Sequence, residues 1–302
     1  MNEQTLYHSK FKIWMLAARP KTLPAAASSA ILGIALAIHD GNFSLLPAII
    51  ALLISILLQV GANFSNDLFD YQKGADAKNR LGPIRVTQAG LLSTRQVTIG
   101  MIFIFSVSAL LGLYLAIDAG WLVVLIGFLA ILAALAYTGG PFPFGYHSMG
   151  DIFVLIFFGF AAVCGTYFVQ AKNISVASIW GGLAMGLLIT NILVVNNLRD
   201  IDSDRLVNKR TLAVSIGIKW TRVEYSMFVL FAYLVPVFLT IYSKTYLFSL
   251  LTWFSVPFAI ILIKEIFIVE GRPLNKTLAG TATLALIYSL LFSLGIILFN
   301  IF

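Results

Sequence analysis

Two polar segments with the same design interrupt an otherwise apolar chain. The first, NDLFDYQKGAD, spans residues 66–76, and the second, NNLRDIDSDR, spans residues 196–205. Each begins with an asparagine that is followed four residues later by an aspartate, and each comes directly after a long apolar run. Because carboxylates are unfavourable in hydrocarbon, we expect both segments at the mouth of a membrane helix bundle. Such clusters of oxygen ligands are typical of a site for divalent metal and phosphate.

The spacing within each segment selects the candidate metal ligands. In the second segment the three members lie at i, i+4 and i+8, so they share one face of a helix that continues to residue 204. In the first segment Gly74 is expected to end the helix and to let the chain bring Asp76 back toward the same ion. Asp67, Asn197 and Asp202 point elsewhere by this geometry. The candidate catalytic and metal-binding residues are Asn66, Asp70, Asp76, Asn196, Asp200 and Asp204.

The ligand types favour magnesium over zinc. Carboxylate and amide oxygens are hard ligands suited to Mg²⁺, which completes its octahedron with water and phosphate oxygens. The three histidines are isolated, and the single cysteine, Cys164, lies in an apolar run, so neither supplies a zinc site. One aspartate-rich turn alone is equally well explained by helix capping. Two matching turns predict instead a Mg²⁺ site that holds a diphosphate.

Cations that can bind a diphosphate follow both polar segments. Gly82-Pro83 indicates an ordered turn before Arg85, and Asn208 indicates one before Lys209 and Arg210. Lys21 stands where the first apolar run begins. Topology alone explains many lysines and arginines in a membrane protein, so each cation is a separate hypothesis. The candidate diphosphate-binding residues are Lys21, Lys73, Arg85, Lys209 and Arg210.

The composition is that of an integral membrane protein. Hydrophobic residues make up 60% of the 302 residues, charged residues only 11%, and mean hydropathy is +0.94. A helix needs about 20 apolar residues to cross the hydrocarbon core. We predict an all-α, polytopic helix bundle that forms one domain over residues 1–302. Its nine spans are expected near 21–39, 44–64, 97–117, 120–137, 151–170, 177–197, 223–242, 246–266 and 277–301.

The distribution of positive charge predicts the orientation in the membrane. No cleavable signal is evident in the first twenty residues, which favours a cytoplasmic N-terminus. With nine spans, 18 of the 20 lysines and arginines then lie on the cytoplasmic side, and only Lys172 and Lys244 lie outside. This bias follows the positive-inside rule. It places both polar segments on the cytoplasmic face of the cell membrane and the C-terminus outside, and it explains the net charge of +7 without a nucleic-acid partner.

The repeated polar segments, the glycines and the prolines predict how the helices are arranged. The two polar segments stand about 130 residues apart on the same side of the membrane, which indicates two related helix groups facing each other across a cavity. Residues 137–151, rich in glycine and proline, predict a loop. Pro236 and Pro257 are expected to kink their spans. Gly182 and Gly186 predict a close contact between helices.

Together these motifs resemble the UbiA superfamily of intramembrane aromatic prenyltransferases. The resemblance covers residues 18–217 and is carried by ARPKTL, NDLFDYQKGAD, GPIRVTQAG, YTGGPFPFGY and NNLRDIDSDRLVNKRTLAV. The step of six residues from Asp70 to Asp76 is similar to the branch that prenylates 1,4-dihydroxy-2-naphthoate, whereas 4-hydroxybenzoate relatives usually step four. Asn208 departs from the glycine common in the family, although asparagine also tolerates a left-handed turn.

The resemblance implies a reaction, its substrates and its cofactor. The expected reaction is Mg²⁺-dependent transfer of a polyprenyl group from polyprenyl diphosphate to 1,4-dihydroxy-2-naphthoate, with loss of CO₂ and diphosphate, as in menaquinone synthesis. An apolar cavity that opens to the bilayer would accept the tail and exclude water. Aromatic side chains near the polar segments would flank the allylic cation. The candidates are Phe64, Phe69, Tyr71, Tyr137, Phe142 and Tyr146.

Other functions stay open from the residues alone. A prenyltransferase for 4-hydroxybenzoate or homogentisate is the nearest alternative. A secondary transporter or divalent-cation carrier also places acidic residues between repeats, but it needs ionisable groups near the bilayer midplane, where this sequence has almost none. The D-G-x-x-A-R motif of CDP-alcohol phosphotransferases is absent from the sequence. The sequence determines neither the length of the isoprenoid chain nor the oligomeric state.

Overall fold

The computed structural model describes residues 9–74 and 81–301, and nearly all of them are helical. Residues 75–80 include Asp76, so this predicted ligand lies outside the described residues. The first half of the chain contains α1 (Lys10–Ala18), η2 (Pro20–Thr22), α2 (Leu23–His39), α3 (Leu45–Gln72), α4 (Thr94–Ala119), α5 (Trp121–Ala136), η3 (Phe144–Tyr146) and α6 (Gly150–Val154). The second half contains η4 (Leu155–Ala161), α7 (Ala162–Ala171), α8 (Val176–Arg199), α9 (Ile201–Leu206), α10 (Leu212–Tyr242), η5 (Lys244–Ser255), α11 (Val256–Ile268) and α12 (Leu274–Phe299).

The described helices confirm a multi-pass membrane protein. Eight helical stretches within the described ranges are long and apolar enough to cross a membrane, and several combine consecutive elements, such as α6, η4 and α7. The apolar helix α5 is shorter, at 16 residues, and it occupies the remaining predicted position. The predicted all-α bundle of about nine spans is therefore confirmed, and the helices follow one another along the chain in the predicted order.

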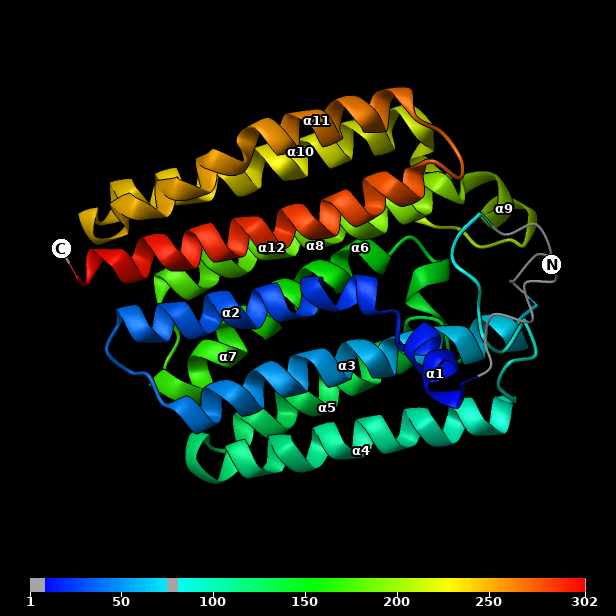
Figure 1. Ribbon diagram of the computed structural model, residues 1–302, viewed down its shortest axis with the longest axis horizontal. Helices are drawn as coiled ribbons and strands as arrows, with labels where there is room; N and C mark the ends of the chain where they lie inside the picture. The colour runs from blue at the N-terminus through cyan, green and yellow to red at the C-terminus, as the bar shows by residue number, and fades with distance from the viewer. Residues whose placement is uncertain (1–8, 75–80, 302) are drawn as a thin grey trace.

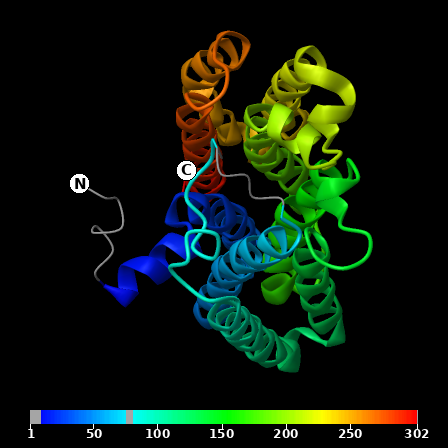
Figure 2. The same ribbon diagram turned by 90° about the vertical axis from the view of Figure 1, so that its right-hand side faces the viewer.

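The long helices run side by side along the longest axis of the molecule (Figure 1). The loop that follows α3, the short helix α9 and the transverse helix α1 lie at one end, which we call the polar end. The C-terminus lies at the opposite end, which we call the far end. Figure 2 looks onto the polar end and shows the helices as a bundle seen end-on. Both polar segments end their helices at this polar end, as their positions in the sequence predicted.

The largest hydrophobic cluster joins α2, α7, α8, α10 and α12. Tyr167, Tyr225, Tyr233 and Tyr288 of this cluster are buried, and their hydroxyl groups have hydrogen-bond partners, as buried tyrosines usually do. Tyr288 donates to the carbonyl oxygen of Ala232 at 2.7 Å, and the hydroxyls of Tyr225 and Thr281 lie 2.9 Å apart. This cluster makes a fixed frame from which α8 delivers the second polar segment.

Glycines allow one close approach inside this frame. A Cβ atom added to Gly159 would lie 2.5 Å from the carbonyl oxygen of Gly182 and 2.7 Å from Cα of Gly186. The predicted contact of Gly182 and Gly186 is therefore confirmed. Their partner is η4, a π-helical segment of seven residues that interrupts its span.

The two prolines behave differently. Pro257 is the second residue of α11, so the eighth predicted span changes at this point from the 3₁₀ segment η5 to an α-helix. The helix α10 continues through Pro236, and its non-helical residue is Gly217, with φ 79°. Glycine reaches this region of φ without the clash that a Cβ atom causes.

Candidate active site

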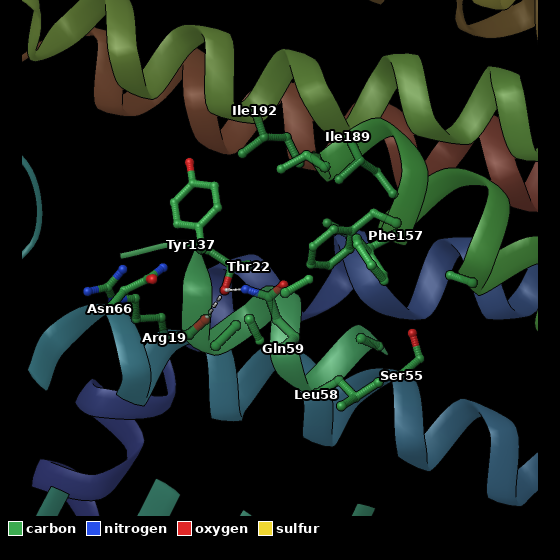
Figure 3. Close-up of a pocket in the computed structure, with 18 of the residues that line it drawn as sticks. Arg19, Thr22, Ser55, Leu58, Gln59, Asn66, Tyr137, Phe157, Ile189 and Ile192 are labelled. Carbon is green, nitrogen blue, oxygen red and sulfur yellow. Dashed lines mark hydrogen bonds between the residues drawn. The ribbon is translucent and has the colours of Figure 1, made fainter. Parts of the chain in front are cut away.

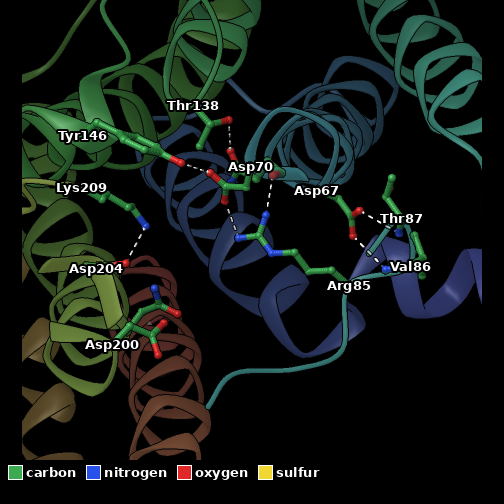
Figure 4. Close-up of polar contacts among 12 residues, drawn as sticks. Asp67, Asp70, Arg85, Val86, Thr87, Thr138, Tyr146, Asp200, Asp204 and Lys209 are labelled. Atoms are coloured by element: carbon green, nitrogen blue, oxygen red, sulfur yellow. Dashed lines mark hydrogen bonds and ion pairs between the residues drawn. The ribbon is translucent and has the colours of Figure 1, made fainter. Parts of the chain in front are cut away.

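The first polar segment ends α3 with a buried, fully paired carboxylate. Asp70 is only 2% exposed and forms an ion pair with Arg85. Its Oδ1 also accepts a hydrogen bond of 2.7 Å from the hydroxyl of Tyr146. One turn earlier, Oδ1 of Asn66 accepts a hydrogen bond of 3.1 Å from Thr138 (Figure 4). Asn66 and Asp70 thus share one face of the helix, as their spacing predicted.

Asp67 positions the loop that carries Arg85. Its buried carboxylate accepts hydrogen bonds of 3.1 Å from the backbone N–H groups of Val86 and Thr87. The neighbouring guanidinium can then reach into the site, where it also donates to the backbone carbonyl oxygen of Asn66 at 2.5 Å. Asp67 therefore points away from the site, as expected, and holds the loop against α3.

The second polar segment keeps its predicted spacing although the helix changes at Asp200. The helix α8 ends at Arg199. Asp200 follows as the C-cap of α8 and the N-cap of α9, with backbone angles φ −99° and ψ 8°. Its backbone N–H still donates to Asn196 at 3.2 Å, and the N–H of Asp204 donates to Asp200 at 2.8 Å. These two bonds maintain the i, i+4, i+8 relationship on which the prediction depended.

Arg199 is a site residue that the sequence analysis missed. Its guanidinium donates to both carboxylate oxygens of Asp200, at 2.8 and 2.5 Å, and to Oδ1 of Asn196 at 2.8 Å. It also donates to Oδ1 of Asn275 on α12 at 2.7 Å. Arg199 stands three residues after Asn196 and directly before Asp200, so helical spacing could have predicted these two contacts. The contact with α12 has no such local signal.

Asp204 differs from Asp70 and Asp200 because its carboxylate is only partly paired. It is buried, and Nζ of Lys209 lies 3.4 Å from its Oδ1. Its Oδ2 is buried and has no hydrogen-bond partner among the described residues. Burial raises the pKa of Asp204 above the ordinary range, and the nearby positive charge of Lys209 opposes this shift.

Tyr146 connects the two polar segments. Its hydroxyl contacts Asp70, while the ammonium groups of Lys73 and Lys209 lie 4.8 and 5.5 Å from its ring centroid, within the range of cation–π contacts. The backbone N–H of Arg210 donates to the carbonyl oxygen of Tyr146 at 3.1 Å, which ties the loop to the second segment. Burial and the charge of Asp70 raise the pKa of Tyr146, so it remains a neutral donor.

The remaining predicted cations lie at different depths. Lys21 is exposed in η2 and lines the cavity described below. Arg210 is exposed, and its contacts with Tyr146 and Ser148 are made by its backbone. Lys209 and Arg85 both line the cavity. Of the two adjacent residues Lys209 and Arg210, the structure therefore directs only Lys209 toward the interior.

A cavity of about 1770 Å³ opens from these polar groups into the bundle. Asn66 and Tyr137 line it near the polar end, and Leu58, Phe157 and Ile192 line its apolar part (Figure 3). Burial together with the nearby aspartate charges raises the pKa of Tyr137, so its hydroxyl stays neutral. The arrangement combines a charged recognition site with a long hydrophobic chamber.

The residues present fit a magnesium ion that is completed by substrate. Within the described ranges, no three acidic, histidine or cysteine side chains gather closely enough to hold a metal by themselves. Mg²⁺ in proteins is commonly bound by one or two carboxylates together with substrate phosphates. The unpartnered Oδ2 of Asp204 and the amide oxygens of Asn66 and Asn196 are ligands of the required kind.

Comparison with known proteins identifies the family. The profile of the UbiA prenyltransferase family matches residues 26–287. The 1,4-dihydroxy-2-naphthoate octaprenyltransferase of Haemophilus influenzae is 37% identical over 310 residues, which cover 99% of this chain and 100% of that protein. The protein of the same name from Escherichia coli is 39% identical over 99% of this chain and 98% of its own length. A UbiA homolog from Archaeoglobus fulgidus, solved bound to GPP and Mg²⁺, shares the fold with a TM-score of 0.69 at 13% identity, over 94% of this chain and 99% of its own. The predicted resemblance is confirmed, and this chain belongs to the UbiA prenyltransferase family.

Proposed function

We propose that this protein transfers a polyprenyl group from polyprenyl diphosphate to 1,4-dihydroxy-2-naphthoate, with release of diphosphate and CO₂. The product would be demethylmenaquinol, an intermediate of menaquinone synthesis. The observation that carries the proposal is a single apolar cavity whose polar end is lined by both Asn/Asp segments. The choice of acceptor is supported by the relatives from Haemophilus influenzae and Escherichia coli, which align over nearly their whole length and are named 1,4-dihydroxy-2-naphthoate octaprenyltransferases.

The proposed cofactor is Mg²⁺, held between the two polar segments. When bound, the metal would stabilise the negative charge that develops on the departing diphosphate. The unpartnered buried oxygen of Asp204 and the hard, all-oxygen donor set support this proposal. The proposed ligands are the six predicted residues Asn66, Asp70, Asp76, Asn196, Asp200 and Asp204.

Cations around the polar end would bind the diphosphate. Lys209 is the first choice because it lines the cavity and its contact with Asp204 is long, which leaves its ammonium group able to donate to phosphate. Arg85 and Lys21 also line the cavity. Lys73 is next to the same cluster, since its ammonium group lies 4.8 Å from the ring centroid of Tyr146. Arg210 is the weakest of the five candidates because its described contacts are made by its backbone.

The cavity walls would protect the allylic cation and orient the acceptor. Apolar side chains such as Ile131, Phe157 and Ile192 exclude water from the position where the carbon–oxygen bond breaks. The ring of Tyr137 lines this region and can stabilise positive charge through its π-face. The electron pair of the bond between the ring and the departing carboxylate would restore aromaticity after the new carbon–carbon bond has formed.

We also propose that the polar end faces the cytoplasm and that residues 1–302 act as one domain. The predicted topology, which places 18 of the 20 lysines and arginines on one side, supports this orientation. The described helices pack into a single bundle around the shared cavity (Figure 2).

Turnover with a panel of acceptors tests the proposed function. Purified protein would be given Mg²⁺, a polyprenyl diphosphate and, separately, 1,4-dihydroxy-2-naphthoate, 4-hydroxybenzoate and homogentisate, and products would be identified by mass spectrometry. We expect prenylated product that has lost its carboxylate from the naphthoate alone, with CO₂ released in step with diphosphate. A prenylated 4-hydroxybenzoate that retains its carboxylate, without naphthoate turnover, would contradict the acceptor but not prenyl transfer.

A further inference from the structure

A row of polar side chains continues from the first polar segment into the membrane span. Gln59, Asn63, Asn66 and Asp70 follow one another on α3 at intervals of four, three and four residues, so they share one face of the helix. Gln59 is the fifteenth of the 28 residues of α3, near the middle of this span. At about 1.5 Å per residue, it stands about 10 Å from Asn66 along the helix axis. A polar side chain at this depth is unfavourable in hydrocarbon, so its presence needs an explanation.

The hydrogen bonds around Gln59 determine which end of its amide is used. They begin at the carbonyl oxygen of Ala18, which can only accept, so the atom of Asn63 that lies 2.9 Å from it must be Nδ2. Oδ1 of Asn63 is then an acceptor, and Nε2 of Gln59 donates to it at 3.2 Å. Nε2 also donates to Oγ1 of Thr22 at 3.3 Å, and the hydroxyl of Thr22 donates in turn to the carbonyl oxygen of Arg19 at 2.9 Å (Figure 3). Both hydrogens of the amide nitrogen are thus used, and Oε1 remains.

Oε1 of Gln59 is an unused acceptor on the wall of the cavity. Gln59 lines the cavity, whereas Asn63 behind it is only 3% exposed. Oε1 makes no hydrogen bond to the described residues and is not one of their buried unpartnered atoms, so it is open to the cavity. Ser55, one turn further along this wall, already donates its hydroxyl proton to the carbonyl oxygen of Ala26 at 2.8 Å. The polar side chains of this wall, Thr22, Ser55 and Gln59, therefore offer acceptors and no free donor, which selects a ligand that carries a hydroxyl group.

Of the two proposed substrates, only the aromatic acid carries a hydroxyl group. The prenyl tail is a hydrocarbon, and its diphosphate accepts hydrogen bonds. In 1,4-dihydroxy-2-naphthoate the hydroxyl at position 1 stands next to the carboxylate and hydrogen-bonds to it within the molecule. The hydroxyl at position 4 lies directly across the ring and is free to donate. A ring placed between the diphosphate site and Gln59 would therefore direct its 4-hydroxyl group toward Gln59.

We propose that Oε1 of Gln59 accepts a hydrogen bond from the 4-hydroxyl group of 1,4-dihydroxy-2-naphthoate, and that this contact selects and orients the aromatic substrate. The inference rests on the proposed function, because it takes the naphthoate as the acceptor of the prenyl group. With the 4-hydroxyl group at Gln59, positions 1 and 2 of the ring face the polar end. The carbon that bears the carboxylate then lies toward the place where the carbon–oxygen bond of the prenyl diphosphate breaks.

Two naphthoates and two variants test this contact. 1-Hydroxy-2-naphthoate lacks only the 4-hydroxyl group, and the measured quantity is the ratio of kcat/KM for the dihydroxy acid to kcat/KM for this analogue. In Gln59→Leu and Gln59→Met we expect the ratio to fall about tenfold from the wild-type value, which corresponds to the loss of one hydrogen bond. The 4-hydroxyl group also activates the ring chemically, but this effect is the same in every variant. A partly folded variant leaves the ratio unchanged, because both substrates are compared in one preparation. The matched control Ser55→Ala removes another polar group of the same wall and should keep the wild-type ratio.

Calorimetric titration of both naphthoates, with Mg²⁺ and without prenyl diphosphate, gives the same comparison as a ratio of affinities. A wild-type ratio in both Gln59 variants would overturn the inference and leave the proposed function intact. Failure of the proposed function has a different signature, namely no turnover of 1,4-dihydroxy-2-naphthoate by the wild type. The titration then tests the contact alone. Equal affinities of the wild type for the two naphthoates would overturn it, and a preference for the dihydroxy acid that is lost in Gln59→Leu would support it.

Discussion

Three of the predicted aspartate ligands lie in the described residues, and they differ in how far their charge is neutralised. Asp70 is paired with Arg85 and Tyr146, and Asp200 is held by both arms of Arg199. Asp204 keeps one buried oxygen without a partner among the described residues. A buried, unsatisfied acceptor is costly unless a ligand completes it. We therefore infer that Asp204 contributes most directly to metal binding, while Asp70 and Asp200 also organise the cations around the site.

Replacement of Asp204 separates binding from stability. We expect Asp204→Ala to lower kcat/KM by at least 100-fold at saturating Mg²⁺, because the metal loses a ligand that no neighbour replaces. Stability should change little, since the buried Oδ2 makes no hydrogen bond to the described residues. Turnover and thermal unfolding in detergent would be measured together. Asp202→Ala is the matched control on the same helix, since Asp202 is exposed and should keep near-normal turnover. Equal losses in both variants would disprove the assignment of Asp204.

Replacement of Asp70 should affect both activity and stability. Asp70→Ala leaves the buried guanidinium of Arg85 without its carboxylate, and breaking one side of a buried pair costs about 3–5 kcal/mol. The double variant Asp70→Ala with Arg85→Ala removes both charges and should recover part of this stability but no activity. Thermal unfolding and turnover of the wild type and of the single and double variants would be compared. A double variant that is no more stable than Asp70→Ala would show that the ion pair is not what stabilises this region.

At this scale the sequence identified residues that repeat with helical spacing, and it missed those that depend on tertiary contacts. Asn66, Asp70 and Asn196 line the polar end of the cavity, while Asp200 and Asp204 contact Arg199 and Lys209, which also line it. The hydrogen bond from Arg199 to Asn275 and the hydrogen bond from Tyr146 to Asp70 join elements that are distant in the chain, and no local pattern encodes them. Whether the predicted ligands bind Mg²⁺ stays a prediction.

At the scale of elements, the loop over residues 81–92 depends on α3. The buried carboxylate of Asp67 is the acceptor for the N–H groups of Val86 and Thr87, and Arg85 stands next to them. We expect Asp67→Ala to increase amide hydrogen exchange at these two residues and to raise the Michaelis constant for the diphosphate, because Arg85 loses its anchor. Asp118→Ala is the control, since its ion pair with Lys172 is exposed at the far end. Unchanged exchange across residues 81–92 would contradict this role.

Two glycines in one interrupted span give opposite expectations. In Gly159→Ala the new Cβ atom would lie 2.5 Å from the backbone of Gly182, so α8 and η4 must separate. Overpacking of this kind costs about 1–3 kcal/mol. In Gly165→Ala the Cβ atom enters open space, and the gain in helix propensity is about 0.5–1 kcal/mol. Thermal unfolding should therefore fall for the first variant and rise slightly for the second. A rise for both would show that the contact between η4 and α8 is loose.

The elements show how far hydropathy alone can predict a bundle. Long apolar windows gave the positions of the spans, since each must cover the same hydrocarbon thickness. The π-helical segment η4, the break at Gly217 and the 3₁₀ segment η5 were not predicted. These irregularities arise from packing between helices, which a window of hydropathy does not record. Pro236 was expected to kink its span, yet the non-helical residue in α10 is Gly217.

At the scale of the whole molecule, the helices α3 and α8 end at the same end of the bundle (Figure 1), and residues of both polar segments line one cavity. The expectation of two helix groups facing each other across a cavity depended only on the repeated segment. The structure adds the contacts that join the two segments, because Tyr146 contacts Asp70 and Lys73 of the first segment and Lys209, which follows the second. A long donor entering from the bilayer would have its diphosphate at the polar end and its tail along the bundle.

The orientation of this assembly in the membrane follows from charge and can be measured. In a Cys164→Ser background, single cysteines would replace Asn42 and Lys244 at the far end and Ala89 at the polar end, all of which are exposed. Because 18 of 20 lysines and arginines lie on the polar side in the predicted topology, we expect a membrane-impermeant thiol reagent to label the first two in intact cells. The cysteine at position 89 should react only after the cells are permeabilised, which also verifies that it is accessible. Labelling of position 89 in intact cells would place the candidate active site on the outer face. Both substrates would then have to be supplied from outside, contrary to an enzyme that draws an aromatic acid from the cytoplasm.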